Sequence, residues 1–131
     1  MSDIPKTPAE WRTILTPMQF HVLREKGTER AFTGALWNEK SSGKYHCAGC
    51  GALLFSGEAK YASGCGWPSF TQSIVDGATA YNTDRTFGMR RVEVVCTACD
   101  GHLGHVFNDG PPPLGTRYCI NSASLTFHPD A

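Results

Sequence analysis

Two Cys-x-x-Cys pairs constrain the fold of this chain more than any other feature of its sequence. They stand in "CAGCG" at 47–51 and in "CTACDG" at 96–101, each followed by small or turn-forming residues. A tight turn of this form presents two thiolates to one metal ion, and a small residue beyond it lets backbone N–H groups approach the sulfurs. The sequence therefore predicts one structural zinc ion per chain in a tetrahedral shell. Its ligands would be Cys47, Cys50, Cys96 and Cys99.

A shell of four thiolates leaves no open position on the metal. The ion is therefore expected to hold two distant loops of one fold together and to take no part in chemistry. Three other interpretations stay open at the level of the sequence. Iron can occupy the same shell, the pairs can be two separate redox motifs, and the four thiols can be small hydrophobic core residues.

The length and charge of the chain limit the number of domains and the classes of partner that it is expected to bind. Its 131 residues fit a single domain over 1–131, and 12 Lys and Arg balance 12 Asp and Glu. This neutral balance argues against binding nucleic acid or an anionic membrane. The first residues lack the pattern of a signal peptide, and no apolar run approaches the ~18 residues of a membrane span, so a cytoplasmic location is expected. In that reducing compartment cysteines more often serve metals or catalysis than structural disulfides.

Helix signals gather near the N-terminus. "TPAE" and "TPMQ" are each typical of a capping box with Pro at the first helical position, which predicts two short helices. The second helix is expected to cover residues 17–26, with Phe20 and Leu23 facing inward and Gly27 ending it.

Strand signals dominate from Phe32 onward, where short alternating runs predict a mainly β fold with antiparallel sheets. In "RRVEVVC", Val92 and Val94 share one face and Glu93 lies on the other, as in a half-buried strand. "RYCINSASLTF" at 117–127 is interpreted as a strand, and "DGPPPLGT" at 109–116 as an ordered surface loop leading into it.

Two cysteines remain outside the metal site. Cys65 lies between two glycines in "SGCGWPSF", in an expected loop, and Cys119 shares a strand face with Arg117 and Asn121. A nearby guanidinium favours the thiolate, which is the reactive form of cysteine. The alternatives are a free buried Cys119 with an incidental Cys65, or a structural disulfide between the two.

The segment "GHLGHVFND" at 101–109 adds two histidines, and its two glycines predict a loop that enters a strand. Because thiolates already serve the metal, proton donation is the better use for His102 and His105, although such a pair taken alone is more often structural. Trp67 stands next but one to Cys65 and is expected either in the core or as the wall of a pocket. No role is assigned to His21, His46 and His128.

These motifs resemble a known family. "SGCGWPSF", "HLGHVFNDGP" and "RYCINSASLTF", with the two cysteine pairs, are similar to methionine sulfoxide reductase B from about Thr7 to Phe127. That family reduces the R epimer of methionine sulfoxide in peptides and proteins, which repairs oxidative damage. The resemblance implies two curved antiparallel sheets, like a barrel or sandwich, with N-terminal helices, and a thioredoxin-type reductant.

The resemblance also implies roles for individual residues. Cys119 becomes the nucleophile and Cys65 the resolving cysteine. The other expected catalytic residues are His102, His105 and Asn121, and the expected substrate contacts are Trp67, Arg117, Phe107 and Asp109.

The chemistry of a sulfoxide agrees with these roles. Its sulfur is electrophilic, but its oxygen leaves only when protonated, so the site needs a thiolate and proton donors. An indole face can stabilise the cationic character that the sulfur then acquires. Cys119 would become a sulfenic acid, Cys65 would convert it to a disulfide, and thioredoxin would reduce that disulfide by exchange.

Two rival functions remain at this level. A zinc-ribbon binding module without catalysis would need only the four metal-site cysteines, and a Cys/His hydrolase would use Cys119 with His105 but would leave Cys65 without a role. A monomer is expected, since a small enzyme acting on exposed side chains needs an open cleft.

Overall fold

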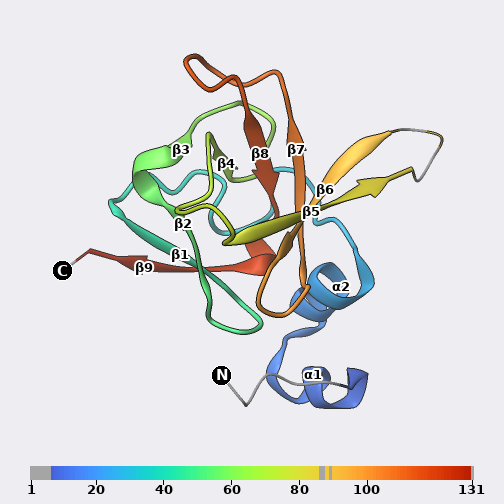
Figure 1. Ribbon diagram of the computed structural model, residues 1–131. Helices are drawn as coiled ribbons and strands as arrows, with labels where there is room; N and C mark the ends of the chain where they lie inside the picture. Colours follow the sequence, from blue (N-terminus) through green and yellow to red (C-terminus); the bar gives the residue numbers. More distant parts are fainter. Residues whose placement is uncertain (1–6, 86–87, 89, 131) are drawn as a thin grey trace.

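The computed structural model describes residues 7–85, 88 and 90–130, which form two helices followed by two antiparallel sheets (Figure 1). This confirms the expected mainly β architecture. Within those residues, no helix has the length and apolarity that a membrane crossing requires. The helices are α1 (Pro8–Ile14) and α2 (Pro17–Glu25), and the short 3-10 turns are η1 (Gly57–Ala59) and η3 (Ser122–Ser124).

The smaller sheet has the strand order β2-β1-β9, and the larger one has the order β3-β4-β8-β7-β6-β5. The strands of the smaller sheet are β1 (Gly43–Cys47), β2 (Leu53–Ser56) and β9 (Leu125–Pro129). Those of the larger sheet are β3 (Lys60–Tyr61), β4 (Ser69–Phe70), β5 (Thr79–Asp84), β6 (Arg91–Cys96), β7 (His102–Phe107) and β8 (Arg117–Ile120).

Both predicted capping boxes are present. Thr7 accepts from the backbone N–H of Glu10, whose side chain accepts from the N–H of Thr7, and Thr16 and Gln19 repeat this arrangement. Each cap stabilises its helix by about 1 kcal/mol because it satisfies N–H groups that have no partner within the helix.

The end of α2 differs from the expectation that Gly27 stops the helix. Lys26 is the residue in the left-handed conformation, with φ 58°, and the N–H of Gly27 donates to the carbonyl of His21 at 2.8 Å. A Cβ on Gly27 would lie 2.2 Å from the His21 ring. Glycine is therefore required here by a close approach and not by its φ angle.

The core is a cluster of large side chains from both sheets. Tyr45 and Phe55 come from the smaller sheet, and Phe70, Leu103 and Ile120 come from the larger one, and all five have no exposed surface. Phe55 and Phe70 stack with ring centroids 4.3 Å apart. Burying each such side chain contributes about 1.5–3 kcal/mol, so the sheets are held face to face by this cluster.

The prediction of one strand over 117–127 is wrong. β8 ends at Ile120 in the larger sheet, η3 turns the chain, and β9 begins at Leu125 in the smaller sheet. The turn is stabilised by the hydroxyl of Ser124, which donates to the carbonyl of Asn121 at 2.7 Å. Small polar residues that satisfy the backbone locally let the chain change sheets here.

The expected faces of β6 are also wrong at Glu93. This side chain is 2% exposed, whereas Val92 is 42% exposed. The strand lies inside the larger sheet between β5 and β7, and its pairing with β7 shifts between Val94 and Val95. Residues 93–96 are all buried, so both faces of the strand are covered there. Glu93 points into a buried polar cluster.

Candidate active site

The four cysteines of the two pairs come together, as predicted. Cys47 and Cys96 end strands β1 and β6, and Cys50 and Cys99 lie in the turns that follow. The sulfurs of Cys47 and Cys99 are 3.7 Å apart, those of Cys50 and Cys96 are 3.5 Å apart, and all four lie within 4.8 Å of one another. A tetrahedral shell with metal–sulfur bonds of ~2.3 Å has sulfur–sulfur edges of about 3.8 Å. The cluster therefore has the dimensions to hold one metal ion.

Charge within this cluster favours a cation. Hydrogen bonds to neighbouring sulfurs, that of Cys50 first, raise the pKa of the Cys47 thiol, and burial adds to the effect. Hydrogen bonds from Cys47 and Cys99 lower the pKa of Cys96. Four thiols in one small space cannot all ionise against each other, and a divalent cation removes that conflict.

The N-terminal helices pack against the cluster of four cysteines. The Arg24 side chain donates to the carbonyl of Cys99 at 2.9 Å and lies over the Trp11 ring at 4.5 Å. A Cβ on Gly49, between the two cysteines of the first pair, would lie 3.1 Å from Trp11. The cysteine turns and helices thus form one packed unit at one end of the molecule.

The remaining two cysteines also meet. Cys65 lies in the loop between β3 and β4, Cys119 lies in β8, and their sulfurs are 3.6 Å apart. Ser69 brings them together because it pairs with Cys119 across the sheet and its hydroxyl lies 3.4 Å from the Cys65 sulfur. A disulfide bond is ~2.05 Å long, so these are two free thiols in contact.

The two thiols differ in acidity. Burial opposes ionisation of Cys65, but hydrogen bonds from Ser63 and Ser69 outweigh it and lower the pKa to about 7. Burial, then the charge of Cys65, raise the pKa of Cys119 to about 12. Arg117 does favour the Cys119 thiolate, as expected, but its effect is smaller than these two. Cys65 is therefore the more acidic of the two thiols and begins to ionise near neutral pH, whereas Cys119 stays protonated there.

The Arg117 guanidinium also forms an ion pair with Asp109. Its guanidinium donates to both oxygens of Asp109, at 2.9 and 3.2 Å, and lies over the Phe107 ring at 4.4 Å. Asp109 is largely exposed and does not line the cavity beside the two sulfurs, but it lines a second cavity together with Cys65 and Arg117. Its carboxylate also holds the Arg117 guanidinium in place.

A cavity of about 310 Å³ opens beside the two sulfurs. Seven of the residues predicted for the site line it: Cys65, Trp67, His105, Phe107, Arg117, Cys119 and Asn121. Three further lining residues were not predicted: Thr28, Arg91 and Gly104. The cavity combines aromatic walls with two thiols, an imidazole and cationic groups, which suits a small polar group attached to an apolar chain.

Glu29, which sequence reasoning missed, ties two of the lining residues together. Its carbonyl accepts from Trp67 Nε1 at 3.0 Å, and its N–H donates to Asn121 Oδ1 at 2.9 Å. The Asn121 amide in turn donates to the carbonyl of Leu103 at 2.9 Å. Glu29 is 4% exposed and its carboxylate accepts from the N–H of Ala123 at 2.8 Å. No local pattern marks it, since its partners are distant in sequence.

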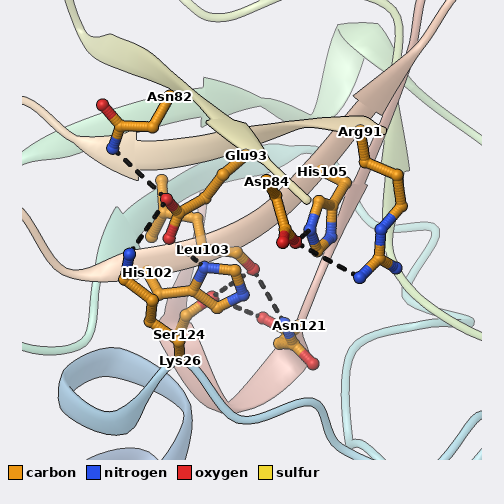
Figure 2. Close-up of polar contacts among 10 residues, drawn as sticks. All are labelled: Lys26, Asn82, Asp84, Arg91, Glu93, His102, Leu103, His105, Asn121 and Ser124. Carbon is orange, nitrogen blue, oxygen red and sulfur yellow. Dashed lines mark hydrogen bonds and ion pairs between the residues drawn. The ribbon is translucent and has the colours of Figure 1, made fainter. Parts of the chain in front are cut away.

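Both predicted histidines lie within strand β7 and not in a loop before it. Residues three apart normally face opposite sides of a strand, but β7 shifts its register with β6 between them. The two rings consequently lie side by side, with centroids 5.5 Å apart (Figure 2). His105 lines the cavity, whereas His102 is 3% exposed and lies behind it.

Each histidine faces a carboxylate that the sequence did not reveal (Figure 2). His102 Nδ1 lies 2.6 Å from Glu93 Oε2, and His105 Nε2 lies 2.7 Å from Asp84 Oδ2. Burial lowers the pKa of His102 in spite of Glu93. Burial acts to raise the pKa of Glu93, but the hydrogen bonds from His102 and Asn82 outweigh it and lower the pKa. His102 is therefore neutral and Glu93 charged near neutral pH.

Comparison with known proteins gives a consistent picture. The family model described as SelR domain matches residues 15–129. A peptide methionine sulfoxide reductase MsrB from Thiobacillus denitrificans is 59% identical over 128 residues, covering 98% of this chain and 97% of that protein. A protein of the same name from Leptospira interrogans is 56% identical over 95% of both chains. Another, from Agrobacterium fabrum, is 52% identical over 98% of this chain and 99% of its own length.

Proposed function

This chain belongs to the SelR-domain family, and from that membership we propose that it is a peptide-methionine (R)-S-oxide reductase. It returns methionine (R)-sulfoxide in peptides and proteins to methionine and so repairs oxidative damage. The observation that carries the proposal is the contact of two free thiols, 3.6 Å apart, at the wall of an aromatic-lined cavity. The choice of the R epimer rests on the family resemblance.

Cys119 is the nucleophile in this proposal. Its sulfur bonds to the sulfoxide, oxygen passes to Cys119, and the products are methionine and a Cys119 sulfenic acid, so atoms and electrons balance. Since Cys65 is the thiol that ionises first, the reactive Cys119 thiolate forms when a proton crosses the contact from Cys119 to the ionised Cys65.

The cavity supplies the other requirements of the reaction. His105 lines it and is paired with Asp84, so it can deliver a proton to the sulfoxide oxygen. Trp67 and Phe107 provide apolar faces for the S-methyl group and can stabilise cationic character on the sulfur. Asn121, with its amide held between Glu29 and Leu103, orients the backbone beside Cys119.

Cys65 then attacks the sulfenic acid, which releases water and forms the Cys65–Cys119 disulfide. The sulfurs must approach from 3.6 Å to ~2.05 Å. Glycines on both sides of Cys65, with φ angles of 82° and 89°, give its loop backbone conformations that other residues rarely adopt.

A thioredoxin-type dithiol reopens this disulfide by exchange. Cys65 lines a second cavity of about 560 Å³ on the other side of Arg117, together with Tyr61 and Gly110. Cys119 is not among the described residues that line it. We therefore propose that the reductant attacks Cys65 and expels Cys119.

Trapping tests this direction. A thioredoxin that retains only its attacking cysteine, mixed with the oxidised enzyme, should form a mixed disulfide that peptide mapping assigns to Cys65. Assignment to Cys119 would contradict the argument from access.

The metal is proposed to be zinc. Four thiolates at these sulfur–sulfur distances suit a closed tetrahedral zinc shell, which supplies structural stability and no open position for chemistry. The proposed location is the cytoplasm, because a thiolate metal shell and a thiol-based reaction cycle both suit a reducing compartment. A monomer suffices, since a single chain contributes every proposed site residue.

The decisive test is chiral chromatography of a blocked methionine sulfoxide supplied as both epimers, with dithiothreitol and the metal-loaded protein. Selective loss of the R epimer is expected. Cys119→Ser should abolish it, whereas Cys65→Ser should still complete one reduction per enzyme but fail to cycle with thioredoxin. Survival of both epimers would instead favour a metal-containing binding module, and labelling by an acylating substrate would favour a hydrolase.

A further inference from the structure

Glu93 is a buried carboxylate close to the cavity histidines that takes no part in the reaction steps proposed for the two cysteines. Glu93 lies in β6 with 2% of its surface exposed, and His102, in β7, has 3% exposed. Figure 2 shows the pair beside the second pair, His105 with Asp84. Burying a carboxylate costs several kcal/mol unless it is well compensated, so its retention in the sheet calls for a specific use.

Both carboxylate oxygens of Glu93 have partners that offset the cost of burying the charge. Oε2 lies 2.6 Å from His102 Nδ1, and Oε1 lies 3.2 Å from Asn82 Nδ2 and 3.5 Å from Lys26 Nζ. Lys26 is placed there by the left-handed turn that ends α2. These three donors keep Glu93 ionised, and an ionised carboxylate can only accept hydrogen bonds.

This geometry determines which nitrogen of His102 carries hydrogen. A contact of 2.6 Å between Nδ1 and a carboxylate oxygen requires hydrogen on Nδ1, and a neutral imidazole has only one N–H. Nε2, on the far edge of the ring, is therefore an acceptor. It is buried and has no hydrogen-bond partner among the described residues.

We propose that Glu93 is a positioning residue of the reductase, which holds His102 in the tautomer protonated at Nδ1 and keeps Nε2 as a buried acceptor beside the site. The two histidines then have different tasks. His105 delivers a proton in the cavity, whereas His102 accepts a hydrogen bond at Nε2, and Glu93 holds the hydrogen on Nδ1 that leaves Nε2 free to accept. The effect of Glu93 on the reduction rate rests on the proposed function, whereas the tautomer of His102 does not depend on it.

The first test measures the tautomer in the substrate-free protein. Long-range hydrogen–nitrogen NMR correlation of ¹⁵N-histidine-labelled protein distinguishes a protonated from a bare ring nitrogen, and His102→Gln identifies the signals of His102. Hydrogen on Nδ1 with a bare Nε2 is expected near neutral pH. Hydrogen on Nε2 would overturn the proposal, whether or not the protein reduces sulfoxides.

The second test compares two substitutions of Glu93 in single-turnover reduction. Glu93→Leu removes the acceptor, so the hydrogen should leave Nδ1. The rate should fall about tenfold, which is less than the ~10²–10⁴-fold effect of a group that itself transfers the proton, because Glu93 acts through His102. Glu93→Gln keeps an acceptor oxygen and should retain the Nδ1–H tautomer and a higher rate than Glu93→Leu.

Glu25→Gln is the matched control. It removes the same charge near the same buried space, but Glu25 pairs with His21 and not with His102. In this variant the NMR signals of His102 and the rate of single-turnover reduction should match those of the unmodified protein. If Glu93→Leu folds, moves the hydrogen to Nε2 and still reduces at the original rate, Glu93 is a structural residue only.

Discussion

Loss of the metal should destabilise the whole domain, because the cysteine cluster closes a long loop of the chain. Cys50 and Cys96 are 46 residues apart. Closing a loop of this length removes about 13–14 cal/mol/K of entropy from the unfolded chain, which stabilises the folded state by about 4 kcal/mol at 25 °C. We therefore expect metal removal to lower the free energy of unfolding by about this amount, and the Cys50→Ser substitution to do the same where it abolishes metal binding.

The corresponding change in melting temperature follows from the size of the domain. At about 2.1 cal/mol/K of unfolding entropy per residue, the 131 residues give ~0.28 kcal/mol/K, so a loss of ~4 kcal/mol lowers Tm by about 15 °C. Cys65→Ser is the matched control, since it replaces a cysteine outside the cluster. Its Tm should stay within about 2 °C of the unmodified protein, the range of an ordinary surface substitution.

The assay is calorimetry of metal-loaded, chelated and Cys50→Ser protein in excess reductant, with metal content measured on the same samples. The reductant excludes disulfides as a substitute cross-link. If the metal is completely removed and Tm falls by less than about 5 °C, closure of this loop by the metal does not stabilise the fold.

Three further predictions follow from single contacts. A Cβ on Gly104 would lie 2.1 Å from a carbonyl oxygen of β8, so Gly104→Ala should cost about 2 kcal/mol or more in urea unfolding; an unchanged midpoint would refute this. Folding lowers the pKa of His102 below its ordinary value of 6.5 and that of Glu93 below its ordinary value of 4.5. As the pH falls, the unfolded chain therefore binds these protons before the folded chain does. The free energy of unfolding should decrease as the pH drops below 6.5 and again below 4.5. Urea midpoints that stay constant from pH 7 to 4 would contradict it. Ser63→Ala removes a 3.0 Å hydrogen bond to the Cys65 sulfur and should raise the pKa of Cys65 above about 7, as measured from its alkylation rate against pH.

Features that depend on a few adjacent residues could be predicted from the sequence. The capping boxes at Thr7 and Thr16 formed as expected, because each uses groups only three residues apart. The two Cys-x-x-Cys pairs likewise form turns, and their four cysteines lie close enough together to bind one metal ion. The end of α2 was less accurate, since a side chain from an earlier turn, His21, determined why residue 27 is glycine.

Most of the predicted site residues do converge on one cavity, but their relations to each other could not be predicted. The acidity of Cys119 was expected from Arg117, its neighbour on the strand, yet it depends more on burial and on Cys65 from a distant loop. Glu93 appeared to face solvent because alternation in an isolated strand takes no account of what covers either face.

The sequence by itself determined the class of fold, the four cysteines of the candidate metal site, the family and the identity of most cavity residues, since these follow from local spacing and from motifs. Only the tertiary structure decided which thiol is the more acidic, which carboxylate each histidine faces and where the chain changes sheets. Those outcomes depend on strand register and burial. A shift of one residue between β6 and β7 brings His102 and His105 to the same side, and no spacing within either strand encodes that shift.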